Sequence, residues 1–202
     1  MRKYDPAIHH RRSVRLRGYD YSQAGAYFVT ICAQGRRCLF GEIINHEMHL
    51  NEFGIIAYQE WEALPARWKH IDIGAFQIMP NHMHGVIIIN TILPSEAAQT
   101  ASHNLLPMPI SPNLIDTKTQ WADNPTLGQI VGAYCSITQV NCVNFVKGNK
   151  PNEYLGKVWQ RNYHEHIIRS VKAFDMISNY IINNPANWEK DTFFTPINPR
   201  SS

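Results

Sequence analysis

The sequence predicts an α+β fold, and two observations support this. Segments rich in β-branched and aromatic residues alternate with segments of helical periodicity in the order strand, helix, strand, strand, helix, strand, and one more helix follows. The 202 residues are 44% hydrophobic, which suits one globular core. This order is the split βαβ pattern, so we expect a ferredoxin-like (RRM-like) antiparallel sheet with helices on one face, an added C-terminal helix, and the other face free for a ligand.

The first predicted strand covers residues 26–32, which are mostly β-branched and aromatic. A turn then leads into a second strand over residues 38–44, and we expect these two strands to form a hairpin. Asn51 is a suitable N-cap for the first helix. That helix is expected to run to about Leu64, because Pro65 cannot continue it.

Two further strands are predicted over residues 71–79 and 83–90, with Pro80 and Asn81 at the corner between them. Residues 91–125 differ in composition, because they contain five prolines and no glycine and show no periodicity. A segment of this length without periodicity is typical of a mobile insertion outside the core.

The second half of the chain begins with a capping box formed by Thr126 and Gln129, and helical spacing continues to about Lys147. Residues 157–169 are predicted to be extended, and Ser170 is a suitable N-cap for the last helix. The predicted organisation is a basic N-terminal arm (1–25), one domain (26–190) that carries the insertion (91–125), and an irregular tail (191–202).

Charge and cysteine usage limit the class of protein. The chain has 19 basic and 16 acidic residues, and residues 1–17 hold six of the basic ones with a single acid. Such an arm is either a solvated tail or a phosphate-binding arm beside a nucleic-acid site. The four cysteines form no C-x-x-C pair, and no apolar run reaches the ~20 residues of a membrane span. We expect a cytoplasmic protein with reduced thiols and no membrane partner.

His82 and His84 lie at the start of the strand predicted up to residue 90. Alternate side chains of a strand lie on the same face, so both imidazoles point the same way and can bind one metal ion. For an isolated pair of this kind, two histidines that pack in a core are the favoured interpretation, and the rest of the chain has to support a metal site. A zinc hydrolase is disfavoured, because no H-E-x-x-H motif and no third strong ligand accompany the pair.

Tyr180 lies on the edge of the apolar stripe of the last helix, with Asn183 and Asn184 about one turn later. A tyrosine in such a place usually packs its ring and points its hydroxyl to water. The nearby carboxamides favour a second interpretation, in which they complete a metal site or orient a phosphate.

Four motifs follow one another along the chain: Met79-Pro80-Asn81-His82-Met83-His84-Gly85, Val158-Trp159-Gln160-Arg161-Asn162-Tyr163, His166-Ile167-Ile168-Arg169, and Tyr180-Ile181-Ile182-Asn183-Asn184-Pro185 with Trp188. In this order they resemble the REP-associated tyrosine transposases, which are single-tyrosine members of the HUH (His-hydrophobic-His) endonucleases. The segments His9-His10-Arg11-Arg12-Ser13 and Gly18-Tyr19-Asp20-Tyr21 are similar to that family as well. The resemblance spans nearly the whole chain except the insertion.

The resemblance implies a metal-dependent endonuclease and strand transferase that acts on single-stranded DNA at hairpin-forming repetitive palindromes. It implies that Tyr180 is the nucleophile, which forms a 5′-phosphotyrosine intermediate, and that His82 and His84 hold a divalent cation. Asn184 is the implied third ligand, with Asn183 as the alternative, because a proline after Asn184 disfavours helical geometry there. The implied cation is Mg²⁺ or Mn²⁺, and two imidazoles suit Mn²⁺ better.

The resemblance also implies contacts with DNA hairpins and action at the nucleoid, as a monomer or a homodimer. A second H-x-H, His164-Glu165-His166, matches the family only at His166, so His164 is expected to be incidental. The alternative function is that of a catalytically inactive protein of the same fold that binds DNA or RNA hairpins by occupancy alone. The expected DNA-binding residues are Arg11, Arg12, Arg15, Arg17, Arg161, His166 and Arg169.

Overall fold

A computed structural model of the protein describes residues 16, 18–91, 123–150 and 155–194. The basic arm and the insertion over residues 91–125 therefore lie mostly outside the described residues, as does the tail beyond residue 194. The DNA contacts expected from the arm lie outside them as well, namely Arg11, Arg12, Arg15 and Arg17.

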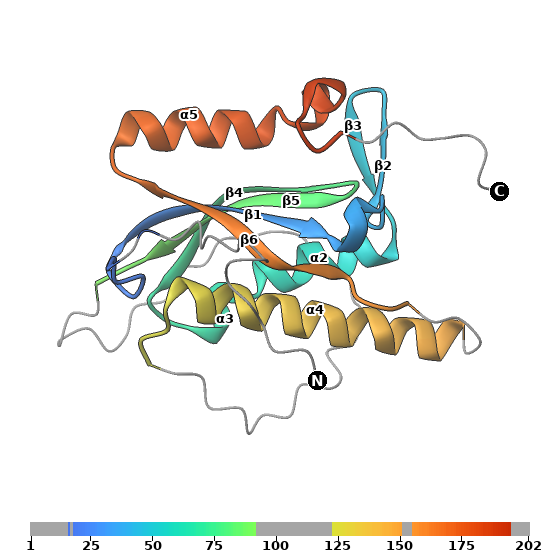
Figure 1. Ribbon diagram of the computed structural model, residues 1–202, viewed down its shortest axis with the longest axis horizontal. Helices are drawn as coiled ribbons and strands as arrows, with labels where there is room; N and C mark the ends of the chain where they lie inside the picture. Colours follow the sequence, from blue (N-terminus) through green and yellow to red (C-terminus); the bar gives the residue numbers. More distant parts are fainter. Residues whose placement is uncertain (1–15, 17, 92–122, 151–154, 195–202) are drawn as a thin grey trace, which may run out of the picture.

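Four strands form one antiparallel sheet in the order β4-β5-β1-β6 (Figure 1). Strands β1 and β5 lie in the centre and β4 and β6 at the edges, which is the ferredoxin-like arrangement. The predicted fold class is therefore confirmed. The bounds of the strands are β1 Gly25–Ala33, β4 Ile71–Met79, β5 His82–Ile89 and β6 Trp159–Ile168.

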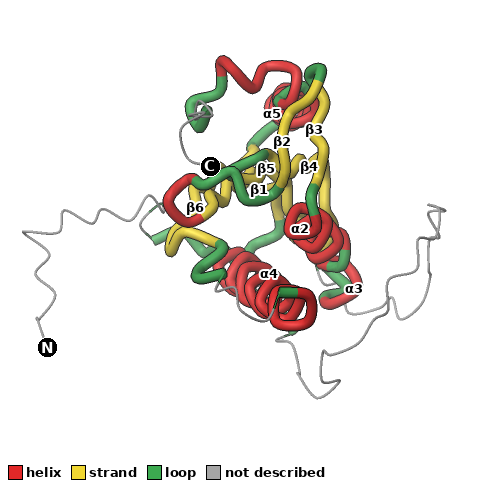
Figure 2. The backbone as a smooth tube through the Cα atoms, turned by 90° about the vertical axis from the view of Figure 1, so that its right-hand side faces the viewer, coloured by secondary structure: helices red, strands yellow, loops and turns green. Residues whose placement is uncertain are grey.

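One face of the sheet carries three helices, α2 (Glu52–Glu62), α3 (Leu64–Arg67) and α4 (Leu127–Asn149) (Figure 2). The predicted caps are confirmed: Asn51 and Ser170 accept amide hydrogen bonds at the starts of α2 and of the last helix, and Thr126 and Gln129 form the capping box. Pro65 does not end the first helix, because α2 stops before it and Pro65 lies in the first turn of α3, where no amide hydrogen bond is lost. None of the described helices is both long and apolar enough to cross a bilayer.

The main core lies between the sheet and these helices. Trp61 of α2 and Tyr134 of α4 are fully buried there and meet edge to face, with ring centroids 5.1 Å apart. Gly85 of β5 faces the Trp61 indole, and a Cβ atom at this position would overlap the ring. The absence of a side chain at residue 85 thus lets the helix approach the strand closely.

We expect Gly85→Ala to lower the free energy of unfolding by about 1–3 kcal/mol, because the added methyl group overpacks against Trp61. Urea unfolding followed by tryptophan fluorescence measures this change. Gly132→Ala in α4 is the matched control: nothing lies within 4 Å of its added Cβ, so the free energy of unfolding should rise by about 0.5–1 kcal/mol. Equal stability of Gly85→Ala and the wild type would contradict this description of the core.

The last helix, α5 (Val171–Ile182), crosses the opposite face of the sheet, so that face is not left entirely free as expected (Figure 1). Phe174, Ile177 and Ile181 pack with Val86 of β5 in a second, smaller core. An amphipathic helix has to bury its apolar stripe, and this face of the sheet offers the apolar surface. Most contacts of α5 are with β4 and β5, and the second core also includes Phe28 of β1 and Ile168 of β6.

The predicted hairpin between the first strand and residues 38–44 is wrong. β1 has β5 on one side and β6 on the other, so neither of its edges is available for a third strand. The chain turns away at a 3-10 segment, η1 (Gln34–Arg36), and β2 (Gly41–Ile44) pairs instead with β3 (Glu47–Leu50). Figure 1 shows this separate hairpin at one end of the sheet, near the 3-10 segment η2 (Pro185–Lys190) that follows α5.

Candidate functional site

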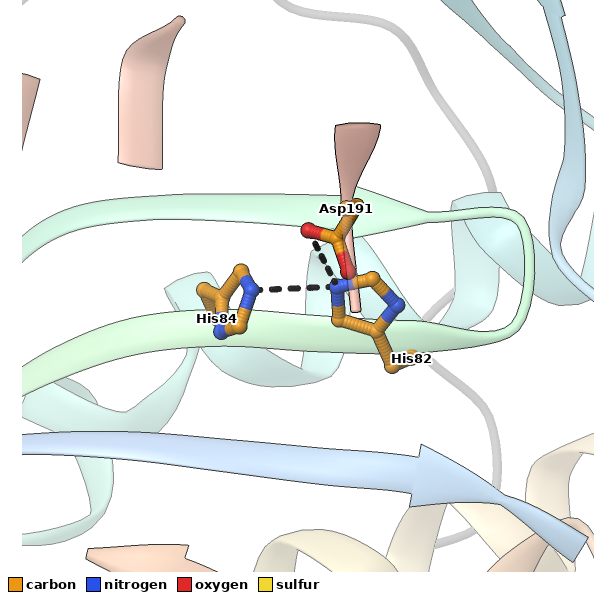
Figure 3. A group of neighbouring side chains, drawn as sticks. All are labelled: His82, His84 and Asp191. Carbon is orange, nitrogen blue, oxygen red and sulfur yellow. Dashed lines mark hydrogen bonds and ion pairs between the residues drawn. The ribbon is translucent and has the colours of Figure 1, made fainter. Parts of the chain in front are cut away.

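His82 and His84 lie at the start of β5 and point to the face of the sheet that α5 crosses (Figure 3). Both residues are buried, with 0% and 1% of their surface exposed. Their Nε2 atoms are 3.0 Å apart. The two imidazoles therefore converge, as the alternation of a strand predicts.

The other ring nitrogen of each histidine has a hydrogen-bond partner. His82 Nδ1 lies 2.9 Å from Asn81 Oδ1, which only accepts, so Nδ1 donates and Nε2 keeps its lone pair. The Asn81 amide nitrogen donates to the Phe193 carbonyl, which fixes the orientation of this side chain. His84 Nδ1 lies 2.8 Å from Thr30 Oγ1, which can accept a hydrogen bond from it. Partners of this kind orient metal-binding histidines.

Burial keeps both histidines neutral. It lowers the pKa of His82 to about 2, because protonated His82 would be poorly solvated and, to a smaller extent, would be repelled by a proton on His84 and by Arg36. It lowers the pKa of His84 to about 4, against the opposing effect of the Asp191 charge. The 4.0 Å approach of His82 Nε2 to Asp191 Oδ2 is therefore not an ion pair between charged groups. Neutral imidazole is the form that binds metals, so no proton has to leave before a cation is held.

Asp191 joins this pair from the segment just beyond η2 (Figure 3). One ligand atom from each of His82, His84 and Asp191 lies within 4.8 Å of the others. The carboxylate is 1% exposed and accepts hydrogen bonds from the Phe193 amide at 2.6 Å and from Asn184 Nδ2 at 2.8 Å. Nothing in the sequence singles out Asp191, since an acidic residue in a segment without periodicity carries no signal. The two phenylalanines that follow it are the one hint that this segment packs against the domain.

Asn184, the expected third ligand, lies beside Asp191. It is 3% exposed, and its Oδ1 has no hydrogen-bond partner among the described residues. A buried carbonyl oxygen without a partner is uncommon in proteins, and oxygens of this type bind hard cations. The backbone of Asn184 is helical, with φ −60° and ψ −41°, despite Pro185. Asn183, the alternative, is exposed and donates to the Asn179 carbonyl instead.

Tyr180 reaches the same group from α5. Its hydroxyl lies 3.3 Å from His84 Nε2 and 3.4 Å from Asp191 Oδ2. The residue is 47% exposed, so its hydroxyl lies where the buried group meets the surface. Burial and the Asp191 charge raise the pKa of Tyr180 above its ordinary value, so the hydroxyl is protonated at neutral pH and donates to the carboxylate.

These residues fit one divalent cation. Two imidazole nitrogens and one carboxylate oxygen converge, and Asn184, whose Oδ1 has no partner among the described residues, bonds that carboxylate through its amide nitrogen. A mixed nitrogen and oxygen set suits Mn²⁺ better than Mg²⁺, which prefers oxygen ligands and water. The arrangement brings a candidate nucleophile, Tyr180, into contact with a candidate metal centre.

We expect Thr30→Val to weaken Mn²⁺ binding about 10–100-fold, because the variant keeps the shape of the side chain but removes the partner of His84 Nδ1. Isothermal titration calorimetry with MnCl₂ measures the affinity. Thr138→Val is the matched control, since this hydroxyl bonds the Tyr134 carbonyl within α4, on the other side of the sheet. Unchanged affinity in Thr30→Val would mean that Thr30 does not orient His84.

The remaining expected DNA contacts lie along the edge strand β6. His166 and His164 are exposed, and both point to the face of the sheet that holds the site, because His164 lies opposite Thr30. The geometry therefore does not set His164 apart from His166. Arg161 and Arg169 are exposed near the two ends of this strand.

No family model matches the chain, but comparisons with individual proteins find similar sequences and structures. A protein of Haemophilus influenzae, described only as an uncharacterized protein, is 38% identical over 192 residues, which are 95% of this chain and 97% of that protein. A REP-associated tyrosine transposase solved bound to a REP hairpin aligns over 91% of this chain and 88% of its own, with a TM-score of 0.50 and 15% identity. At this identity the similarity to the solved structure establishes the fold.

Proposed function

The chain belongs to the same family as the Haemophilus influenzae protein and has the fold of a REP-associated tyrosine transposase, and from these premises we propose that it is a metal-dependent endonuclease and strand transferase for single-stranded DNA. The observation that carries the proposal is the position of Tyr180. Its hydroxyl lies 3.3 Å from His84 Nε2 and 3.4 Å from Asp191 Oδ2. A nucleophile beside a set of metal-binding donors is the arrangement that phosphodiester cleavage through tyrosine requires.

The residues that would hold the cation are His82, His84, Asp191 and Asn184. When bound, a divalent cation supplies Lewis-acid activation of the scissile phosphate and fixes its orientation. The chain itself contributes neutral imidazoles, kept in place by Thr30 and Asn81, and one carboxylate. The burial of these donors raises the strength of their interaction with charge, because water screens them little.

Tyr180 performs the covalent step. Its Oη attacks the phosphorus of the scissile phosphodiester, the bond between phosphorus and the 3′ oxygen breaks, and a 5′-phosphotyrosine and a free 3′-OH result. Asp191 Oδ2, at 3.4 Å, takes the phenol proton, and the departing 3′ oxygen takes a proton from water. Because phenol has an ordinary pKa near ~10, phenolate leaves readily when a 3′-OH attacks in the reverse direction. The strand is then rejoined without ATP.

The proposed substrate is a single strand next to a DNA hairpin, as in repetitive palindromes. His164 and His166 are exposed on the edge strand β6, on the face of the sheet that holds the site, which supports a path for a single strand there. The solved protein of similar fold is bound to a REP hairpin.

A covalent-adduct assay tests the proposal. A hairpin oligonucleotide with randomised single-stranded flanks and a 3′-end label is incubated with the protein and Mn²⁺ or Mg²⁺, then run on a denaturing gel. We expect a labelled protein–DNA species that requires the metal and is absent with EDTA. Binding of the hairpin on a native gel without an adduct under either metal would overturn the enzymatic proposal and leave the inactive hairpin-binding protein.

A further inference from the structure

A second cavity, of about 700 Å³, lies outside the candidate metal centre and is lined by residues of the β2–β3 hairpin and of η2. We call it the hairpin cavity. Its volume is in the range of sites that bind small organic groups. Asn187 and Lys190 line both this cavity and a smaller one of about 320 Å³ that contains Tyr180 and Asp191. The hairpin cavity therefore lies directly beside the cavity in which Tyr180 would attack the scissile phosphate.

The lining of the hairpin cavity combines apolar side chains with two carboxylates and, at the border with the smaller cavity, the ammonium group of Lys190. Trp188 and Phe194 meet edge to face with ring centroids 5.4 Å apart, and Trp188 also lies 6.0 Å from the His82 ring. Glu42 and Glu189 line the same cavity. Carboxylates repel a phosphate but accept hydrogen bonds from amino groups. This lining favours a flat, largely apolar group that carries an amino group.

Two residues of the β2–β3 turn line this cavity and have a backbone conformation that favours glycine. Asn45 and His46 have φ of 52° and 68°, and they form the two-residue turn between the paired residues Ile44 and Glu47. Asparagine is tolerated there, but the second position strongly prefers glycine. Both residues line the cavity. Backbone strain kept at such a residue is typical of a functional position.

We propose that the hairpin cavity binds one unpaired base of the DNA strand, next to the phosphate attacked by Tyr180, and that it prefers a base with an exocyclic amino group. This inference rests on the proposed function and adds base recognition to it. The apolar walls contact the base, and Glu42 and Glu189 accept hydrogen bonds from its amino group. Lys190, at the border of the two cavities, contacts the intervening phosphate. Adenine, cytosine and guanine satisfy this requirement, and thymine does not.

An abasic scan tests the proposal. Single abasic sites are placed in turn along the flanks of a hairpin oligonucleotide, and its affinity for Tyr180→Phe, which does not cleave, is measured by fluorescence anisotropy with Mn²⁺. We expect one position at which removal of the base weakens binding about tenfold, with a similar loss for thymine there. Binding of the intact hairpin with equal affinity for every abasic strand would overturn the proposal.

Variants in the β2–β3 hairpin of the protein test whether the base at that position of the DNA binds in the hairpin cavity. Glu42→Ala should remove the preference for an amino-bearing base, whereas Glu47→Ala, which makes the same charge change on the same hairpin outside the cavity lining, should keep it. His46→Gly should raise the midpoint of thermal unfolding, because glycine adopts the positive φ of this turn position without strain. The same variant should weaken binding of the intact DNA strand. A purely structural role for His46 would move stability and affinity in the same direction, and that result would count against the proposal.

The two proposals fail separately. If the adduct forms but every abasic strand binds with equal affinity, the proposal of base binding in the hairpin cavity is refuted and the proposal of a nuclease stands. A position-specific loss of affinity without any adduct would remove the covalent chemistry and leave base recognition by the hairpin cavity.

Discussion

Tyr180→Phe is expected to lower the rate of covalent adduct formation by at least about 10⁴-fold, as loss of an enzyme nucleophile does, while hairpin affinity stays at the wild-type level. The phenylalanine keeps the ring contacts with His84 and Phe28, whose centroids lie 5.3 Å and 6.3 Å away, and loses only the hydroxyl. Denaturing gels with 3′-labelled DNA measure the adduct, and native gels measure binding. Loss of the adduct with intact binding separates the chemistry from recognition.

Tyr58→Phe is the matched control for this variant. Tyr58 is a partly exposed tyrosine of α2, a helix that packs on the other face of the sheet, so removal of its hydroxyl should leave adduct formation unchanged. Wild-type adduct levels in Tyr180→Phe would place the nucleophile on another residue.

Asp191→Asn is expected to weaken Mn²⁺ binding by more than the ~10–100-fold that changes in the outer shell of a metal site cause. The variant keeps the size of the side chain but removes the only negative charge of the proposed ligand set. It also removes the acceptor of the Tyr180 proton, so the adduct should stay absent even when Mn²⁺ is saturating. Calorimetry measures the first effect and the adduct gel the second.

Asp175→Asn makes the same charge change at an exposed position of α5 and should alter neither quantity. Wild-type Mn²⁺ affinity in Asp191→Asn would exclude the carboxylate as a ligand. The ligand set would then consist of His82, His84 and the Asn184 carboxamide, and the proton of Tyr180 would need another acceptor.

The elements that the sequence predicts correctly are those with local signals. Asn51, Ser170 and the Thr126 capping box act within one turn of helix, so their effect is readable from a few neighbouring residues. The pairing of β2 is predicted wrongly, because it depends on the fact that β5 and β6 occupy both edges of β1. That is a long-range property of the sheet, and local turn residues do not encode it.

The residues of the candidate site also fall into those that a local pattern predicts and those that depend on the folded chain. Alternation along a strand is enough to place His82 and His84 on one face, and the motif order adds Tyr180 and Asn184 by resemblance. The position of Asp191 depends on the path of η2 and on the hydrogen bond between Asp191 and Asn184. No periodic pattern in the sequence predicts either. The lowered pKa values of the histidines depend on burial beneath α5 and the segment after it, which appears only in the folded chain.

The most direct test of the covalent mechanism is to identify the amino acid that carries the DNA. The adduct formed with Mn²⁺ is digested with nuclease and trypsin, and the modified peptide is sequenced by mass spectrometry. Trypsin releases residues 173–190 as one peptide, in which Tyr180 is the single tyrosine. The proposed mechanism predicts a 5′-nucleotide phosphate on Tyr180, and a nucleotide on any other residue would contradict it.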